Sequence, residues 1–264
     1  EKGGRDAAAA IGATLEYNFD VSGDMAAMAA LIEAAAASQP DGIIVSLPDA
    51  DALGPAIKAA VADGIPVVTM NSGLEASAEL GALMHVGQPE RDAGFAAGKR
   101  AMAEGVTKGL CLNQEAFNTA LVDRCTGYFD AMGADLNQID VSNDVAQIET
   151  RTAAALEADP EIDGLLAVGP HVCEAANKAV QAVGADVHLA CFDLSPGVMD
   201  MIEAGDAAFT IDQQQRLQGY MPVIVLHLYN NHAGLLPGNN IASGPGFVDA
   251  SNAAAVKELA GVDR

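Results

Sequence analysis

The segment from Asp41 to Ser72 constrains the fold more than any other part of the sequence, because it has the pattern of one complete β-α-β unit. Gly42–Ser46 and Ile65–Met70 are short apolar runs, typical of parallel strands that are buried on both faces. Between them, Asp49 stands where a helix N-cap is wanted, and apolar residues recur at helical spacing until Gly64. The segment therefore predicts a strand, a helix and a second, parallel strand.

Small polar residues follow both strands of this unit. Ser46 ends the first strand, and Asn71 and Ser72 follow the second. In open α/β sheets, ligands bind outside the carboxyl ends of the strands. We therefore expect Ser46 and Asn71 to lie at a polar ligand site on the edge of a rigid sheet.

The residues of this segment also match the pattern of a known protein family. Together with three further segments in the same order, they resemble the type I periplasmic sugar-binding proteins, the ribose-binding group that feeds ABC importers. The further segments are HVGQPERDAGFAAG (His85–Gly98), NTALVDRCTGY (Asn118–Tyr128) and the run from His188 to Tyr220. The resemblance extends from the first residue to about Val248. It implies a binding module that closes on a sugar and presents it to a membrane permease.

Apolar and helical patterns alternate along the rest of the chain, which predicts a mostly parallel sheet with helices on both faces. There are too many strands for one open sheet, so the predicted fold class is α/β, with two doubly wound lobes joined by a three-segment hinge. The first lobe is predicted to hold residues 1–87 plus 214–244, and the second 88–213 plus 245–264. The predicted strands are Thr14–Asn18, Gly42–Ser46, Ile65–Met70, Ala82–Val86, Gly109–Asn113, Asp163–Val168, Val187–Asp193 and Ala207–Ile211. The predicted helices include Asp24–Ala37, Thr119–Met132, Val145–Ala158, His171–Ala182 and Gln215–Asn230.

The resemblance places three ligand contacts in the second lobe, namely Arg124, Asp193 and Gln213. Their chemistry suits a sugar: a carboxylate accepts hydrogen bonds from two hydroxyls, and a guanidinium fork donates to neighbouring ones. Asp193 ends an apolar strand, where a buried charge is costly without a partner, and Arg124 is the expected partner. We expect one ligand to contact all three side chains.

The sequence departs from the ribose-binding pattern at other sugar contacts. By resemblance, Asn71 stands in place of an acidic residue, Ser46 in place of an Asn, and Gly169 with Pro170 in place of an Asn-Asp pair. We therefore expect the ligand to be held differently from ribose. Glu115 and Asn118 lie nearby and could restore polar contacts. Phe117 and Phe192 are the nearest candidates for a stacking face, although a residue placed like Phe192 in an apolar strand is more often core. The helix pattern that begins at Glu1 has no strand before it, so this chain is expected to lack part of the first-lobe site.

Composition excludes several kinds of partner. With 13 basic and 36 acidic residues, the formal net charge is −23, which repels nucleic acid and anionic membranes. No apolar stretch is long enough to span a bilayer, and no leader peptide is visible, so the chain reads as cytosolic or already processed. The resemblance implies the second: a periplasmic or extracytoplasmic, membrane-anchored monomer whose partners are a small-molecule sugar and a permease.

The four cysteines fit neither a disulfide framework nor a metal knuckle. Cys111 and Cys191 lie in apolar strands and read as small buried hydrophobes, whereas Cys125 and Cys173 fall on predicted helices. In an oxidising compartment a Cys111–Cys125 bridge is permitted, but sequence does not decide its geometry.

No motif for catalysis is visible. The sequence has no GxGxxG, no GxxxxGKS and no GxSxG, and its five histidines form no metal-ligand pattern. We therefore expect no enzyme activity, no cofactor and no metal. Two alternatives remain: the sugar-responsive effector domain of a LacI-type regulator, which shares the fold but is at odds with so acidic a chain, and an α/β enzyme without a recognisable motif.

Overall fold

The computed structural model describes residues 1–20, 23–262 and 264. Contacts within the chain divide it into two compact units. Unit 1 comprises Glu1–Gln88 and Gln214–Ser243, and unit 2 comprises Pro89–Gln213 and Gly244–Arg264. The backbone therefore passes from one unit to the other three times, after residues 88, 213 and 243. The predicted α/β class with two parallel-sheet lobes is confirmed.

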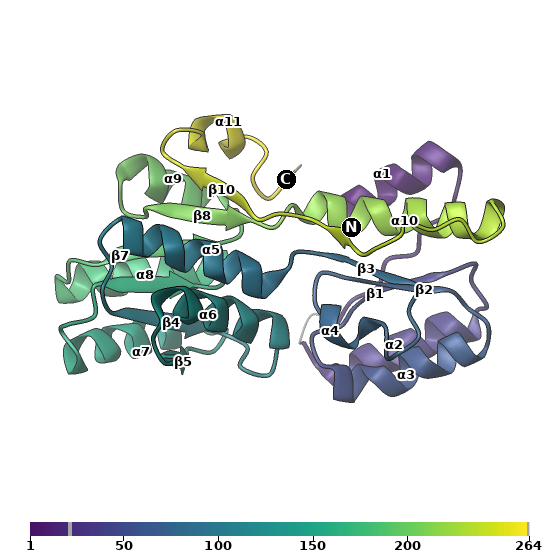
Figure 1. Cartoon of the computed structure of the whole chain (residues 1–264), viewed down its shortest axis with the longest axis horizontal. Helices are drawn as coiled ribbons and strands as arrows, with labels where there is room; N and C mark the ends of the chain where they lie inside the picture. The colour runs from purple at the N-terminus through teal and green to yellow at the C-terminus, as the bar shows by residue number, and fades with distance from the viewer. Residues whose placement is uncertain (21–22, 263) are drawn as a thin grey trace. The chain divides into compact units, whose positions relative to one another are not determined.

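Unit 1 is built on a four-stranded parallel sheet in the order β1-β2-β3-β9. Helices α2 and α3 cover one face, where Ile43 and Val45 pack against Leu53 and Ile57. Helices α1 and α10 lie on the other face (Figure 1), where Val225 packs against Val86. The elements are α1 Lys2–Ile11, α2 Met25–Ala37, β1 Ile43–Ser46, α3 Ala50–Ala62, β2 Val67–Met70, α4 Leu74–Ser77, β3 Met84–Gly87, α10 Gln215–Asn231 and β9 Ile241–Ala242.

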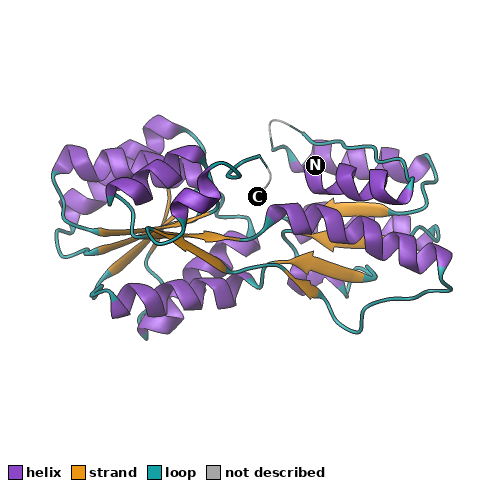
Figure 2. Cartoon of the chain, turned by 90° about the horizontal axis from the view of Figure 1, so that it is seen from above, coloured by secondary structure: helices purple, strands orange, loops and turns teal. Residues whose placement is uncertain are grey.

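Unit 2 has a six-stranded sheet in the order β10-β8-β7-β6-β4-β5, parallel except for β10. Its strands lie between two layers of helices, as Figure 2 shows, with α5 and α6 on one face and α7, α8, α9 and α11 on the other. The elements are α5 Glu90–Ala103, β4 Gly109–Asn113, α6 Thr119–Met132, β5 Gln138–Asp140, α7 Val145–Ala158, β6 Gly164–Ala167, α8 Pro170–Val183, β7 His188–Phe192, α9 Pro196–Ala204, β8 Phe209–Asp212, β10 Gly246–Asp249 and α11 Ala253–Lys257.

The β-α-β unit predicted from Asp41 to Ser72 is confirmed as β1, α3 and β2, with β1 and β2 parallel. The Asp49 carboxylate caps α3 by accepting hydrogen bonds from the backbone N–H groups of Asp51 (3.0 Å) and Ala52 (2.9 Å). This cap satisfies backbone donors that a helix N-terminus leaves without partners. The local sequence thus fixes both the strand ends and the start of the helix beside them.

The strand predicted at Thr14–Asn18 is wrong, because this segment is irregular in the structure. A strand is defined by its hydrogen-bonded neighbour, and within the described residues the segment pairs with none. Three strands were not predicted: β5, β9 and β10. Each is two to four residues long and largely half-buried or exposed, so none has the continuous apolar run that marks a central strand.

The structure has two disulfides: the Cys111–Cys125 bond, which the sequence left open, and a Cys173–Cys191 bond, which was not predicted. Cys111 on β4 is bonded to Cys125 on α6, and Cys173 on α8 is bonded to Cys191 on β7. All four residues are fully buried, as expected for the two strand cysteines, and each pair has its Cα atoms 5.7 Å apart. Each bond therefore fixes a helix to a strand that adjoins it in sequence.

His85 on β3 supplies a prediction about pH. The residue is 1% exposed, and its Nδ1 lies 3.0 Å from the Thr69 hydroxyl. Burial lowers the pKa of His85 to about 4, against an ordinary value near 6.5. Between these values the unfolded chain binds a proton that the folded chain does not, so stability is lost as the pH falls from about 6.5 to about 4, by up to about 3 kcal/mol.

Chemical denaturation at pH 7 and pH 4.5 measures this loss. In the variant His85→Gln, the part of the loss due to His85 should disappear. The control His227→Gln, which changes a half-buried histidine of α10, should behave as wild type. Equal pH dependence in wild type and His85→Gln would contradict the prediction.

Candidate functional site

In unit 2, the predicted residues Arg124, Asp193 and Gln213 lie together at the carboxyl edge of the sheet. Arg124 is on α6 and is 2% exposed, Asp193 follows β7, and Gln213 follows β8. Arg124 Nη1 lies 3.5 Å from Asp193 Oδ2, and Gln213 Nε2 donates to Asp193 Oδ1 at 2.7 Å. The structure thus brings together the three side chains that the resemblance singled out.

Arg124 has a second, closer carboxylate partner that the sequence did not reveal. Its Nε donates to Glu90 Oε2 at 2.7 Å and its Nη2 to Glu90 Oε1 at 3.0 Å, a two-pronged pair. Nη1 also donates to the carbonyl of Val168 at 3.0 Å, and the guanidinium lies 4.5 Å above the centre of the Phe192 ring. Phe192 is fully buried, so of its two predicted roles, stacking face or core, it belongs to the core. The guanidinium is thus held in one orientation from three directions.

The electrostatics of the group follow from burial and from charge balance. Burial alone would lower the pKa of Arg124, but the carboxylates of Glu90 and Asp193 raise it well above its usual range. Burial raises the pKa of Asp193, and the Glu90 charge adds to this, while Arg124 and Gln213 oppose it. Asp193 is thus a carboxylate whose charged form costs the folded protein free energy, at a position 15% exposed.

The backbone at Asp193 is itself unusual. Its φ is +69°, in the left-handed region that only a few non-glycine residues adopt. Its N–H donates to the carbonyl of Ile211 at 2.7 Å, and its carbonyl accepts from the Thr210 hydroxyl at 2.6 Å. Strained backbone of this kind is held by its surroundings and is concentrated at functional sites.

Other predicted residues of unit 2 form a second polar group at the same edge. Asn118 caps α6 and donates from Nδ2 to Glu115 Oε2 at 3.0 Å. Glu115 Oε1 accepts from Asn143 at 3.3 Å, and Asn143 Oδ1 lies 3.1 Å from Nε2 of His171. Burial lowers the pKa of His171, against the opposing charges of Glu115 and Glu174. Asn143 and His171 were not among the predicted site residues.

Two remaining predicted residues frame this second group. Gly169 is the N-cap residue of α8, and a Cβ added there would lie 2.9 Å from Nε2 of Gln114, so a side chain would crowd this amide. Phe117 is 51% exposed in the loop that precedes α6, where its ring is open to solvent.

In unit 1, Ser46 and Asn71 meet at the carboxyl edge, as the strand-end rule predicted. The Ser46 hydroxyl donates to Asn71 Oδ1 at 3.3 Å, and Asn71 has a left-handed φ of +62°. Asn71 Nδ2 donates to Oε1 of Gln218 on α10 at 3.2 Å, and Gln218 donates to the Ser243 hydroxyl at 2.9 Å. Gln218 was missed because 147 residues separate it from Asn71.

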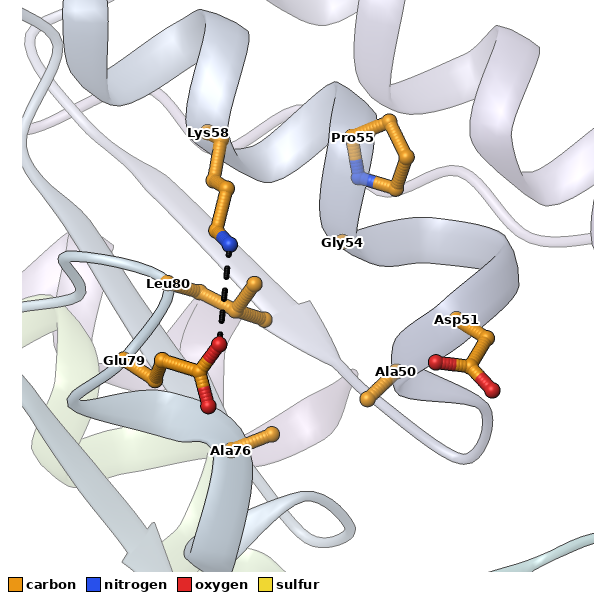
Figure 3. Close-up of a pocket in the computed structure, with 8 residues that line it drawn as sticks. All are labelled: Ala50, Asp51, Gly54, Pro55, Lys58, Ala76, Glu79 and Leu80. Atoms are coloured by element: carbon orange, nitrogen blue, oxygen red, sulfur yellow. Dashed lines mark ion pairs between the residues drawn. The ribbon is translucent and has the colours of Figure 1, made fainter.

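Unit 1 also has a surface hollow of about 450 Å³ between α3 and α4 (Figure 3). The Lys58–Glu79 ion pair, 3.7 Å long, lies beside it, and both side chains are more than half exposed. None of the predicted site residues is among those that line the hollow. An exposed pair of this kind contributes little energy, and we assign the hollow no ligand.

Neither a membrane-spanning helix nor a metal site is found in the described part of the chain. No helix there is long and apolar enough to cross a membrane. No group of three or more His, Cys, Asp or Glu side chains is arranged to hold a metal ion among residues 1–20, 23–262 and 264.

Two α/β units, each with polar side chains gathered at the carboxyl edge of a parallel sheet, have the architecture of a two-lobed binding protein. A family model described as periplasmic binding protein domain matches residues 1–232, and the chain belongs to this family. The resemblance seen in the sequence is thereby confirmed.

Solved structures agree with this assignment. The chain is 40% identical to a carbohydrate transporter of Acidothermus cellulolyticus 11B solved in complex with myo-inositol, with a TM-score of 0.91 over 98% of this chain and 90% of that one. An ABC transporter solute-binding protein of Burkholderia graminis C4D1M, in complex with D-arabinose, shares the fold at 20% identity and a TM-score of 0.87, over 95% of this chain and 90% of that one.

Among curated proteins, the chain is 28% identical over 119 residues to the xylose/arabinose-binding protein XylF of Sulfolobus acidocaldarius. That match spans 42% of this chain and 29% of the relative. These relatives are sugar-binding and transport proteins and not enzymes.

Proposed function

We propose that this protein is an extracytoplasmic solute-binding protein that captures a monosaccharide or a cyclic polyol and delivers it to the permease of an ABC importer. The observation that carries the proposal is the buried group Arg124, Asp193 and Gln213 at a sheet edge. Its donors and its acceptor suit the neighbouring hydroxyls of a ring, and nothing in it suits an activated nucleophile.

The proposed contacts come from both units. In unit 2 they are Arg124, Asp193 and Gln213, with Glu115, Asn118, Phe117 and Gly169 beside them; in unit 1 they are Ser46 and Asn71. The two units are proposed to be the two lobes that close on the ligand, a common motion of such receptors. The protein is proposed to act as a monomer.

The ligand class is narrowed by the relative that is 40% identical, because that protein was solved with myo-inositol. Asn71 and Ser46 also favour a ligand other than ribose, since they replace charged or larger contacts of the ribose-binding pattern. We propose a cyclic polyol such as myo-inositol as the first candidate and pentoses as the second.

The two disulfides support an extracytoplasmic location, because such bonds form and persist in oxidising compartments. The family description points the same way. The alternative of a LacI-type effector domain has no specific observation in its favour.

Thermal denaturation with a ligand panel tests the proposal. We expect one of myo-inositol, D-arabinose, D-xylose, D-ribose or D-glucose to raise the Tm in a saturable way. At 100 times Kd, binding stabilises the folded state by about 2.7 kcal/mol, a Tm shift of roughly 5–10 °C for a protein of this size.

Sucrose at equal concentration gives the baseline, because it stabilises folded proteins by exclusion from their surface. Titration calorimetry then measures Kd for the compound with the largest shift. If every compound behaves like sucrose and gives no saturable heat, the proposed function is wrong.

A further inference from the structure

Glu90 is the first residue of α5 and the second residue after the backbone first enters unit 2. Its side chain is 6% exposed, and both of its carboxylate oxygens accept hydrogen bonds from Arg124. A carboxylate at the start of a helix is ordinarily a surface group that interacts with the helix dipole. Burial against one guanidinium is a different arrangement, because a buried charge is retained only where its partner is well placed.

The packing of α5 on α6 holds this pair in place. The helices touch through glycines: a Cβ on Gly94 would overlap the carbonyl oxygen of Arg124, and a Cβ on Gly127 would overlap that of Arg91. Backbone thus packs on backbone beside the ion pair, and the disulfide of Cys125, the residue after Arg124, fixes α6 to β4. The distance between Glu90 and Arg124 is therefore set by rigid elements.

The Glu90–Arg124 pair is also connected to the carboxylate of Asp193, the proposed ligand contact. Glu90, Arg124, Asp193 and Gln213 form one chain of hydrogen bonds and ion pairs within unit 2, at 2.7, 3.5 and 2.7 Å. Gln213 is the last residue before the backbone leaves this unit. Arg124 makes its two short contacts with Glu90 and a longer one with Asp193.

We propose that Glu90 is the positioning residue of the ligand site: it holds the Arg124 fork so that the guanidinium and the Asp193 carboxylate both face a polyol hydroxyl pair rather than each other. This inference rests on the proposed function. Without the Glu90 charge, the guanidinium turns to Asp193, and the two groups neutralise one another. The ligand then loses a donor and an acceptor together, although Glu90 does not touch it.

The variant Glu90→Gln tests the proposal, because glutamine has the same shape without the charge. Calorimetric titration with myo-inositol, or with the panel sugar that the wild type binds most tightly, should show affinity weakened by about tenfold to a hundredfold, as for the loss of a hydrogen bond to a charged group. The matched control is Glu104→Gln at the C-cap of the same helix, whose carboxylate accepts from Arg100 at 2.8 Å and pairs with His188. Its affinity should equal that of the wild type.

The pH profile of binding separates positioning from a general loss of structure. The groups that face Asp193 are Arg124 from α6, Glu90 from α5 and the Gln213 amide after β8. The Glu90 charge helps to raise the pKa of Asp193, so in Glu90→Gln the acid loss of binding should move to lower pH. A Glu90 carboxylate that only stabilised the packing of α5 on α6, without acting on Asp193, would leave this midpoint where it is.

If Glu90→Gln does not fold, Glu90→Asp serves instead, since it keeps the charge but is too short for both hydrogen bonds; it too should bind more weakly. Wild-type affinity and an unchanged pH midpoint in a folded Glu90 variant would overturn this inference and leave the proposed function standing. A wild type that binds no compound of the panel would overturn the proposed function and this inference with it.

Discussion

Replacing Arg124 by alanine is expected to weaken ligand binding strongly and to destabilise the protein. The change leaves the Glu90 and Asp193 carboxylates in the same buried space without their shared cation. Removing one member of a buried, hydrogen-bonded charge pair costs on the order of 2–5 kcal/mol of affinity, which is roughly 30-fold to several thousand-fold in Kd. The unpaired carboxylates should cost about 3–5 kcal/mol of folding free energy as well.

Calorimetry and thermal denaturation of Arg124→Ala measure the two effects. The matched control is Arg100→Ala, which removes a cation that binds Glu104 and Asp249 and stacks on Phe209 at the amino ends of the strands. It should lose stability but keep its affinity. Ser46→Ala, which removes one neutral hydroxyl in unit 1, should cost only about 1 kcal/mol of affinity. Arg124→Ala with wild-type affinity would mean that the guanidinium is structural and that the site is elsewhere.

Elements with a strong, continuous pattern could be predicted from the sequence to the residue. Gly109–Asn113, Thr119–Met132 and Val145–Ala158 have the predicted bounds, because apolar runs, caps and helix periods coincide there. The segment Thr14–Asn18 has an apolar and polar mixture that suits a strand, yet a strand also needs a neighbour, and no local pattern encodes one. For the same reason β9 was not predicted, because its two residues are too few to show a strand pattern.

The candidate site was predictable where residues follow strand ends. Ser46 with Asn71, and Asp193 with Gln213, meet because parallel strands bring their carboxyl ends to one edge. Glu90 was not predicted, although it lies in the segment HVGQPERDAGFAAG, because an acidic residue at a helix start is usually a dipole contact. Its pairing with Arg124 depends on how α5 crosses α6. The glycines on these helices allow the close crossing, but their positions in the sequence do not predict it.

The disulfides show a limit of the same kind. Both bonds join a strand to a helix next to it in sequence, at separations of 14 and 18 residues. Spacing alone does not say whether a strand residue faces its helix or the opposite layer, because successive strand side chains point to opposite faces. Cys111 lies in the core beneath α5 and α6, and Cys191 in the core beneath α7 and α8. Whether each strand cysteine meets a helix cysteine therefore depends on how the helices pack on the sheet.

Replacing Asp193 by asparagine is expected to move stability and affinity in opposite directions. Burial raises the pKa of Asp193, so its ionised form is disfavoured in the folded protein. The stability that this group contributes is fully present below its unfolded pKa, near 3.9, and is lost as the pH rises through the raised folded pKa. Asparagine never ionises, so at pH 7 Asp193→Asn should have the higher Tm, by roughly 2–4 °C for each kcal/mol regained. The difference should vanish as the pH falls toward 3.9.

The same variant should bind its ligand more weakly, because a carboxylate accepts from hydroxyls more strongly than an amide does. The loss of a charged acceptor costs about 1.5–3 kcal/mol, or roughly tenfold to a hundredfold in Kd. Arg124 keeps Glu90 and the Val168 carbonyl as partners in this variant, so the cation is not left alone in the core. A purely structural carboxylate would lower stability when it is removed and leave affinity unchanged. A rise in Tm together with a fall in affinity would therefore show that the Asp193 carboxylate serves ligand binding and lowers the stability of the fold. A lower Tm at pH 7 with unchanged affinity would refute this assignment.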